Sequence, residues 1–197
     1  MVKLHFALVR ADNADNIVEK VIDSHGKIVA GATVVLVYST GIFEVENGRY
    51  PYLNRPRTTN AKGYLRFTPH KGPYRLLILS HDGYADLKQN QLPKSRVIRL
   101  TPWAGIIGRV LVGGKPPVTH RRVTADWIDV ASASSKYPEI MICSRTLSNA
   151  NGDFIFKRIP AGNVTLSWNS SGTPVRIKPG ALLQVNLNLR PGADRKP

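Results

Sequence analysis

Six residues of the sequence are candidates for binding a ligand: three carry aromatic rings, and three carry amide or guanidinium groups. Together these are the side chains that hold sugars and acidic groups. The C–H face of a sugar ring packs against a Trp or Tyr ring, while nearby polar groups hydrogen-bond its hydroxyls. Trp168 offers the best local arrangement, because Asn169 and two serines follow it. The candidate ligand-binding residues are Trp168, Asn169, Tyr50, Tyr52, Arg121 and Arg122.

The alternative role for these aromatic residues is packing. Trp168 and Trp127 would then lie in a core or at a sheet edge, and Trp103 would wedge a junction between two modules. Tyr50 and Tyr52 would pin their loop to the edge of a sheet. Exposure of at least two tryptophans on one face would favour a carbohydrate-binding platform, whereas burial of every tryptophan would exclude it.

No catalytic or metal-binding arrangement is recognisable in the sequence. The histidines lack the paired spacing of zinc ligands, and the peptidase motif H-E-x-x-H and the nucleophile motif G-x-S-x-G are both absent. The run Gly113-Gly114-Lys115 falls in a predicted hairpin turn with no helix after it, unlike a phosphate-binding loop. We therefore expect a protein that is not an enzyme and that uses no cofactor and no metal.

The cysteine count and the start of the chain bear on the cellular compartment. The single cysteine, Cys143, cannot form an internal disulfide, and we expect it half-buried on a strand as a small hydrophobe. Residues 1–15 do not resemble a signal peptide, because Lys3 and His5 interrupt the apolar stretch, and the longest apolar runs are too short to span a bilayer. Either the protein is cytoplasmic or the chain is a fragment of an exported protein, in which case the cell envelope or the extracellular space is favoured.

The chain is strongly basic, with 28 Lys and Arg against 13 Asp and Glu and a net charge of +15. Such an excess favours an anionic partner when the charges cluster. Here they are scattered, and the densest pairs are Arg55/Arg57, Arg121/Arg122 and Lys157/Arg158. Because a nucleic-acid footprint needs a cluster, nucleic acid is not the expected partner. We expect a monomer that contacts anionic or polysaccharide polymers of the cell envelope, or another protein.

Short apolar segments separated by glycines and prolines indicate an all-β fold. The clearest strand is 32–38, because its β-branched residues suit a buried strand better than a helix; a turn containing Gly26 precedes it. Segment 39–56, interrupted by glycines and prolines, is predicted to be an irregular loop, longer than an ordinary hairpin connection. This loop and the segment 129–140 are expected to be held out for contacts.

The second half of the chain repeats the turns and strands of the first. The turn sequence NAKG at 60–63 returns as NANG at 149–152. Four matched landmarks lie at offsets of 88, 89, 90 and 89 residues, from Gly26 to Gly114, Asn60 to Asn149, Gly72 to Gly162 and Leu100 to Leu189. A near-constant offset indicates a tandem repeat, and each copy is long enough for a small sandwich with its own core.

Both copies carry the same order of glycine-centred motifs. Copy one has D-x-x-G-K-x-V-x-G-A-x-V-x-L at 23–36 and T-T-N-A-K-G-Y-L-R-F at 58–67, and copy two has G-R-V-L-V-G-G-K-P at 108–116 and N-x-x-G-x-F-x-F at 149–156. This order resembles the carboxypeptidase regulatory-like domain over residues 17–190. The resemblance implies transthyretin-like, or prealbumin-like, β-sandwiches that are non-catalytic and accompany bacterial envelope proteins.

Comparison with this family raises two points about individual residues. Glu19 stands where many members carry glycine, which copy two keeps as Gly108. A related module, the collagen-adhesin B-type, joins its first and last strands by a Lys–Asn isopeptide bond. Lys20 lies on the first strand of copy one, whose last strand has no Asn, whereas Asn186 lies on the last strand of copy two, whose first strand has no Lys. We therefore expect no such bond.

These observations predict an all-β fold of two tandem antiparallel β-sandwich modules, transthyretin-like, with about seven strands each. We assign residues 1–16 to an N-terminal strand and linker, 17–101 to the first sandwich, 102–190 to the second and 191–197 to a flexible tail. Pro102 should stiffen the link, so that the modules sit end to end with limited swing. The expected role is a non-catalytic structural or interaction module of a larger bacterial envelope-associated protein. The alternative is a carbohydrate-binding module that uses exposed aromatic and basic residues.

Overall fold

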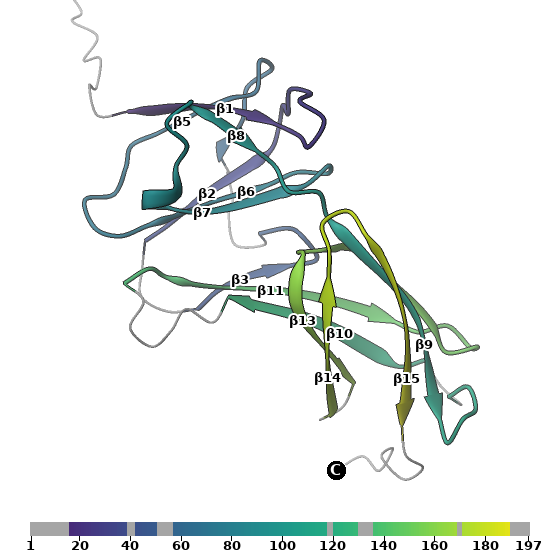
Figure 1. Cartoon of the computed structure of the whole chain (residues 1–197). Helices are drawn as coiled ribbons and strands as arrows, with labels where there is room; N and C mark the ends of the chain where they lie inside the picture. Colours follow the sequence, from purple (N-terminus) through teal and green to yellow (C-terminus); the bar gives the residue numbers. More distant parts are fainter. Residues whose placement is uncertain are drawn as a thin grey trace, which may run out of the picture.

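The computed structural model describes residues 16–38, 42–50, 57–117, 120–129, 136–168 and 171–189. Within these ranges almost all regular structure is β-strand, and η1 (Gln89–Gln91), a single 3-10 turn, is the one helical segment (Figure 1). No helix of the described residues has the length and apolar character that a membrane span needs. The predicted all-β class is confirmed, while the predicted strand before residue 16 and the predicted tail lie outside the described ranges.

The first half of the chain forms a sandwich from the strands β1 (Ile17–Ile22), β2 (Thr33–Val37), β4 (Arg57–Thr58), β5 (Tyr64–Phe67), β6 (Arg75–Leu79), β7 (Tyr84–Lys88) and β8 (Val97–Arg99). One sheet has the order β5-β1-β8 and the other the order β4-β2-β6-β7. Alternate residues of a strand point to opposite faces, so each sheet turns one apolar face inward. Buried side chains such as Val21, Phe67 and Leu76 fill the space between the sheets.

The second half forms a sandwich from the strands β9 (Ala104–Val112), β10 (Arg122–Asp129), β11 (Glu139–Leu147), β12 (Asp153–Ile159), β13 (Gly162–Trp168), β14 (Ser171–Ile177) and β15 (Leu182–Leu189). One sheet has the order β12-β9-β15, and the other contains β14, β13, β10 and β11 in that order. Its core includes Ile106, Phe156 and Leu166. Of the segment 129–140, predicted to be a loop, residue 129 ends β10 and residues 139–140 begin β11, while residues 130–135 lie outside the described ranges.

Both halves use one pairing scheme, which confirms the predicted repeat. In the first half, β1 pairs antiparallel with β5 and parallel with β8; in the second, β9 pairs antiparallel with β12 and parallel with β15. The matched turns are also alike. Asn60 Oδ1 accepts hydrogen bonds from two backbone N–H groups, both at 2.9 Å, and Asn149 Oδ1 accepts two at 2.9 and 2.8 Å. Each turn ends on a glycine with positive φ, Gly63 or Gly152.

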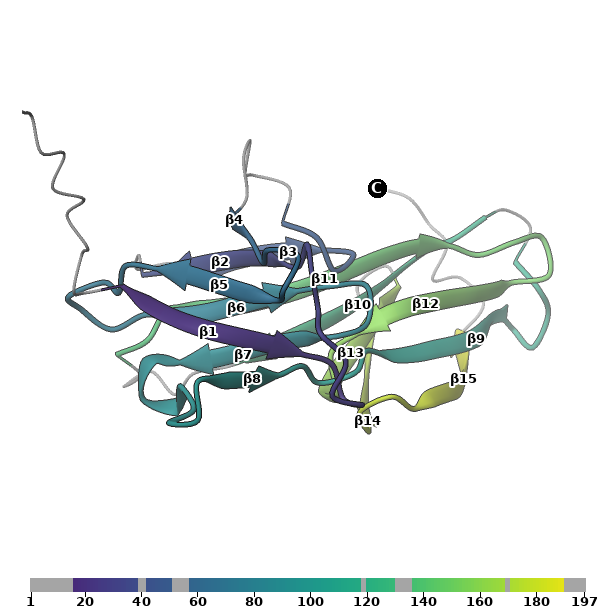
Figure 2. The same ribbon diagram turned by 90° about the horizontal axis from the view of Figure 1, so that it is seen from above.

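Three of the described strand pairs are parallel, which corrects the predicted antiparallel pairing. They are β1 with β8, β9 with β15, and β3 (Ile42–Glu46) with β11. The first and last strands of each sandwich run the same way because the chain enters at one end and leaves at the other. The two sandwiches therefore follow one another along the molecule (Figure 2).

The segment 39–56, predicted to be an irregular loop, contains β3 and supplies it to the other half of the molecule. β3 is the fifth strand of the sheet β14-β13-β10-β11-β3, with Phe43 opposite Ile140 and Val45 opposite Ile142. Val45 is fully buried there. The expectation that each half closes its core with its own strands is wrong at this strand. The physical reason is that β11 covers apolar side chains that a loop would leave in water.

A third cluster of buried apolar side chains joins the two sandwiches. It lies between the sheet β4-β2-β6-β7 and the β11–β3 end of the five-stranded sheet, and it includes Val37 and Ile142. Trp103, in the link between the halves, stacks on Tyr84 with ring centroids 4.6 Å apart and donates a hydrogen bond to the Ser80 carbonyl at 2.9 Å. Trp103 therefore wedges the junction, which is the packing role considered for it.

A buried ion pair lies at the same interface. Arg75 on β6 binds both carboxylate oxygens of Asp86 on β7, and the Nε–Oδ1 distance is 2.9 Å. Arg75 also donates a hydrogen bond of 3.1 Å to the carbonyl of Pro138, in the second half of the chain. The two side chains are only 2% and 8% exposed. The first sandwich is thus attached to the second by a charge-assisted hydrogen bond from Arg75 as well as by apolar packing.

Candidate functional site

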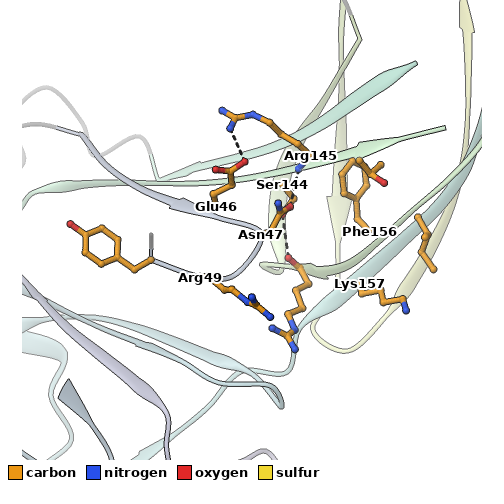
Figure 3. Close-up of a pocket in the computed structure, with 11 residues that line it drawn as sticks. Glu46, Asn47, Arg49, Ser144, Arg145, Phe156 and Lys157 are labelled. Carbon is orange, nitrogen blue, oxygen red and sulfur yellow. Dashed lines mark hydrogen bonds and ion pairs between the residues drawn. The ribbon is translucent and has the colours of Figure 1, made fainter. Parts of the chain in front are cut away.

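An open cavity of about 600 Å³, the junction cavity, lies between the strands β11 and β12 and the end of β3 with the turn that follows it (Figure 3). Most of the ionisable side chains that line it are basic. The charged and aromatic residues of the lining include Arg49, Arg145, Lys157, Arg158, Glu46 and Tyr50. An excess of cations around a concave surface favours a negatively charged ligand.

A tight turn carries Arg49 into this cavity. Asn47 and Gly48 adopt positive φ angles of 51° and 70°, as the hairpin turn favoured by an Asn-Gly sequence requires. Glu46 and Arg49 exchange backbone hydrogen bonds of 2.9 Å across the turn, and the Asn47 N–H donates to the Cys143 carbonyl of β11 at 2.8 Å. A cation from the first half is thereby fixed beside two strands of the second.

A β-bulge in β12 places Lys157 and Arg158 at the same cavity. The register of β12 against β9 shifts by one residue between Phe156 and Ile159. A bulge re-aims the side chains around it. The aliphatic part of the Arg158 side chain lies against Gly48. If Gly48 had a Cβ, that atom would lie 3.3 Å from the Arg158 Cδ. The glycine of the turn therefore makes room for the Arg158 stem.

The charges around the cavity are only partly paired. The Arg145 guanidinium lies 2.8 Å from a carboxylate oxygen of Glu46 (Figure 3) and 3.3 Å from one of Glu44, and both glutamates lie on β3. Among the described residues, the cavity cations with no carboxylate within ion-pair distance are Arg49, Lys157 and Arg158. The cavity therefore keeps a local excess of positive charge.

Trp168, the residue predicted to stack on a sugar, is buried. Its exposed fraction is 4%, and the Arg121 guanidinium carbon lies 5.4 Å from the centre of its ring. Arg122 is exposed at the start of β10, and Asn169 lies outside the described ranges. Arg121 and Trp168 are thus brought together, but as packing partners and away from the residues that line the junction cavity.

The remaining tryptophans are not exposed either. Trp103 is buried at the junction, and Trp127 is partly buried between the second and third clusters. All the tryptophans of the sequence fall in the described ranges. The observation that would have favoured a sugar platform, two exposed tryptophans on one face, is therefore not met.

Tyr50 is the predicted site residue that lines the junction cavity. Its ring stacks on Phe43 of β3, with centroids 4.3 Å apart and planes 18° from parallel. This contact matches the packing alternative, in which the aromatic residue pins its own segment to a sheet. Tyr52 lies outside the described ranges. Sequence reasoning did not identify Arg49, although the Asn-Gly dipeptide before it was a signal for the turn.

Cysteine and histidine are the side chains that most readily act as nucleophiles and metal ligands. Cys143 is buried, and its burial, together with Asp126, raises the pKa of the thiol to about 12. The thiol is therefore protonated at neutral pH and is a poor nucleophile. His70 stacks on Tyr38. No three His, Cys, Asp or Glu side chains of the described residues gather as metal ligands.

The strand registers bear on the Lys–Asn bond considered above. In the first sandwich Val97 of β8 lies opposite Lys20 of β1. In the second, Asn186 of β15 lies opposite Arg109 of β9. Neither register sets a lysine against an asparagine, and Lys20 and Asn186 belong to different sandwiches.

Glu19 is a buried carboxyl group, which the sequence indicated only as a departure from glycine. Its side chain is 2% exposed, and Oε2 has no hydrogen-bond partner among the described residues. Burial raises the pKa of Glu19, and Arg96, whose guanidinium nitrogen lies 3.8 Å from Oε1, opposes that shift. At the equivalent Gly108 of copy two, a Cβ would meet the Phe154 ring at 2.5 Å. The two copies thus fill one core position with a carboxyl group and with an aromatic ring.

No protein-family model and no curated protein matches the chain. Solved structures with some similarity include a streptococcal ancillary pilin, with 14% identity and a TM-score of 0.35 over 91% of this chain and 64% of that one. The Bacillus anthracis TIE protein has 11% identity and a TM-score of 0.34 over 89% of this chain and 34% of that one. The chain thus spans less than two thirds of the length of either structure. Similarity at this level supports no argument about function.

Proposed function

We propose that the chain is a non-catalytic structural and interaction module, in which two β-sandwiches form one rigid unit that spaces and presents its surfaces. The observation that supports this most directly is β3, which leaves the first half and pairs along its whole length with β11. The third apolar cluster and the contact of Arg75 with Pro138 lie at the same interface. A hinge motion there would expose buried apolar groups and break the hydrogen bond from Arg75 to the Pro138 carbonyl, and both changes are costly.

The resemblance to carboxypeptidase regulatory-like domains extends this proposal to a place in a larger bacterial envelope-associated protein. In this proposal residues 17–101 and 102–190 are the two modules, and β3 belongs to the first module in sequence but pairs with β11 of the second. Fractionation of a producing strain, followed by detection with an antibody to this chain, tests the location. Recovery with the envelope or the medium supports the proposal, whereas recovery in the cytoplasm alone contradicts it.

Distance measurements between spin labels test the rigid unit. Labels on cysteines introduced at Lys62 and Lys115, both exposed and in different sandwiches, are read in a Cys143→Ala background. We expect one narrow distance distribution. Val45→Asp removes a buried contact of β3 and should broaden the distribution, whereas Leu182→Asp, at an exposed position on β15, should not. A broad distribution in the protein without either Asp substitution would contradict the proposal.

A further inference from the structure

We propose that the junction cavity binds an oxyanion, namely a carboxylate or phosphate group carried by an acidic ligand. This inference deepens the proposed interaction role, because it gives that role a site and a ligand class. The cations without a carboxylate partner among the described residues are Arg49, Lys157 and Arg158, and all line the cavity. Arg49 is distant in sequence from the other two, so the fold, and not a local run of basic residues, brings them together.

Two separate departures from regular strand geometry produce this convergence. The turn at Asn47 and Gly48 needs positive φ at both residues, and it holds Arg49 at the end of a strand borrowed from the first half. In a regular strand, neighbouring side chains point to opposite faces, so Lys157 and Arg158 would diverge. Both line the cavity, and the register shift of β12 lies at these residues. The same register shift also turns Ile159 into the core of the second sandwich.

The chemistry of the lining fits an acidic group. Arg145 is already occupied by Glu44 and Glu46, which leaves two guanidinium groups and one ammonium group for a ligand. The planar guanidinium fork matches the two oxygens of a carboxylate or a phosphate. Arg158 is held in place by the contact of its stem with Gly48, so binding costs it less side-chain entropy. At about 600 Å³ the cavity also has room for part of the molecule that bears the acidic group.

Calorimetric titration of the whole chain tests the inference with three probes: pyrophosphate, trigalacturonate and the neutral maltotriose. We expect saturable binding of at least one acidic probe and none of maltotriose. K157Q/R158Q should weaken that binding about tenfold, since each partly exposed cation contributes modestly. The matched control K62Q/R66Q removes the same charge from exposed positions of the first sandwich and should change binding less than about twofold. Binding of pyrophosphate alone assigns a phosphate source, and binding of trigalacturonate alone assigns a carboxylate source.

Either of two results would overturn the inference. One is no saturable binding of either acidic probe, and the other is equal weakening by K157Q/R158Q and K62Q/R66Q, which would mean attraction by net charge alone. If K157Q/R158Q does not fold, R49Q on the turn provides the same test without altering the bulge. A narrow spin-label distribution together with failed binding would leave the rigid unit intact and remove only the ligand site.

Discussion

The substitution Asp86→Asn should destabilise the protein by roughly 4 kcal/mol, within the range of about 3–5 kcal/mol found when one member of a buried ion pair is removed. Asp86 is 8% exposed and Arg75 2%, so little water is available to replace the lost carboxylate. The Arg75 guanidinium would keep its bond to the Pro138 carbonyl but lose the negative charge of Asp86. With a urea dependence of about 2 kcal/mol per molar, the unfolding midpoint should fall by about 2 M.

Urea denaturation followed by circular dichroism measures this loss. The double variant Arg75→Met/Asp86→Leu should recover most of it, because both charges leave the interface and apolar groups replace them. The control is Asp153→Asn, which breaks the exposed pair between Arg109 and Asp153 and should cost little. A midpoint for Asp86→Asn no lower than that of Asp153→Asn would refute the reasoning that this pair holds the interface.

Three further substitutions test other features. Glu19→Gln should alter the pH dependence of stability. Because burial raises the pKa of Glu19, the unmodified protein loses the stability contributed by the neutral carboxyl group as the pH rises from the ordinary glutamate pKa through the raised one, whereas the variant does not. Urea midpoints of the two proteins that run parallel across that pH range would contradict this. Gly152→Ala should lower the free energy of unfolding by more than about 2 kcal/mol, because φ is +80° and the new Cβ would meet the Val110 carbonyl oxygen at 2.3 Å. Gly26→Ala, where φ is +87° but no atom lies near the new Cβ, should lower it by about 1–2 kcal/mol. Equal losses of stability in the two variants would argue against the clash. Trp103→Ala removes a buried side chain of the junction and should lower the free energy of unfolding by roughly 3–5 kcal/mol. It should also split a single calorimetric unfolding transition into two. An unsplit transition at an unchanged temperature would show that Trp103 is not needed to join the sandwiches.

The turns of the fold could be predicted from the sequence because they depend on residues a few positions apart. Asn60 and Asn149 each accept hydrogen bonds from their own following backbone, and the expected glycines have positive φ. The partner of β3 could not be predicted, because β11 lies in the other half of the chain and a parallel pairing leaves no local pattern. The alternating residues of 42–46 before Asn47-Gly48 did carry a hairpin signal, but the glycines and prolines around them favoured a loop.

The candidate site was partly visible in the sequence. Lys157/Arg158 stood out as a dense basic pair and Tyr50 as an aromatic residue of the long insert, but their meeting depends on the crossing of β3 and on the bulge in β12. Trp168 looked available to a sugar because polar residues follow it at the end of a strand. It is covered instead by Arg121, which precedes a neighbouring strand. Sequence neighbours alone do not show which side chain from elsewhere will cover a ring.

The parallel pairing of first and last strands determines how each sandwich would respond to being stretched. If the two ends of the chain are pulled apart, β1 and β8 are drawn in opposite directions along their own axes, and so are β9 and β15. Their hydrogen bonds then resist the force together, in shear, and do not open one after another like a zipper. β9 and β15 are matched over eight residue pairs and β1 and β8 over three, so under tension the first sandwich should yield before the second.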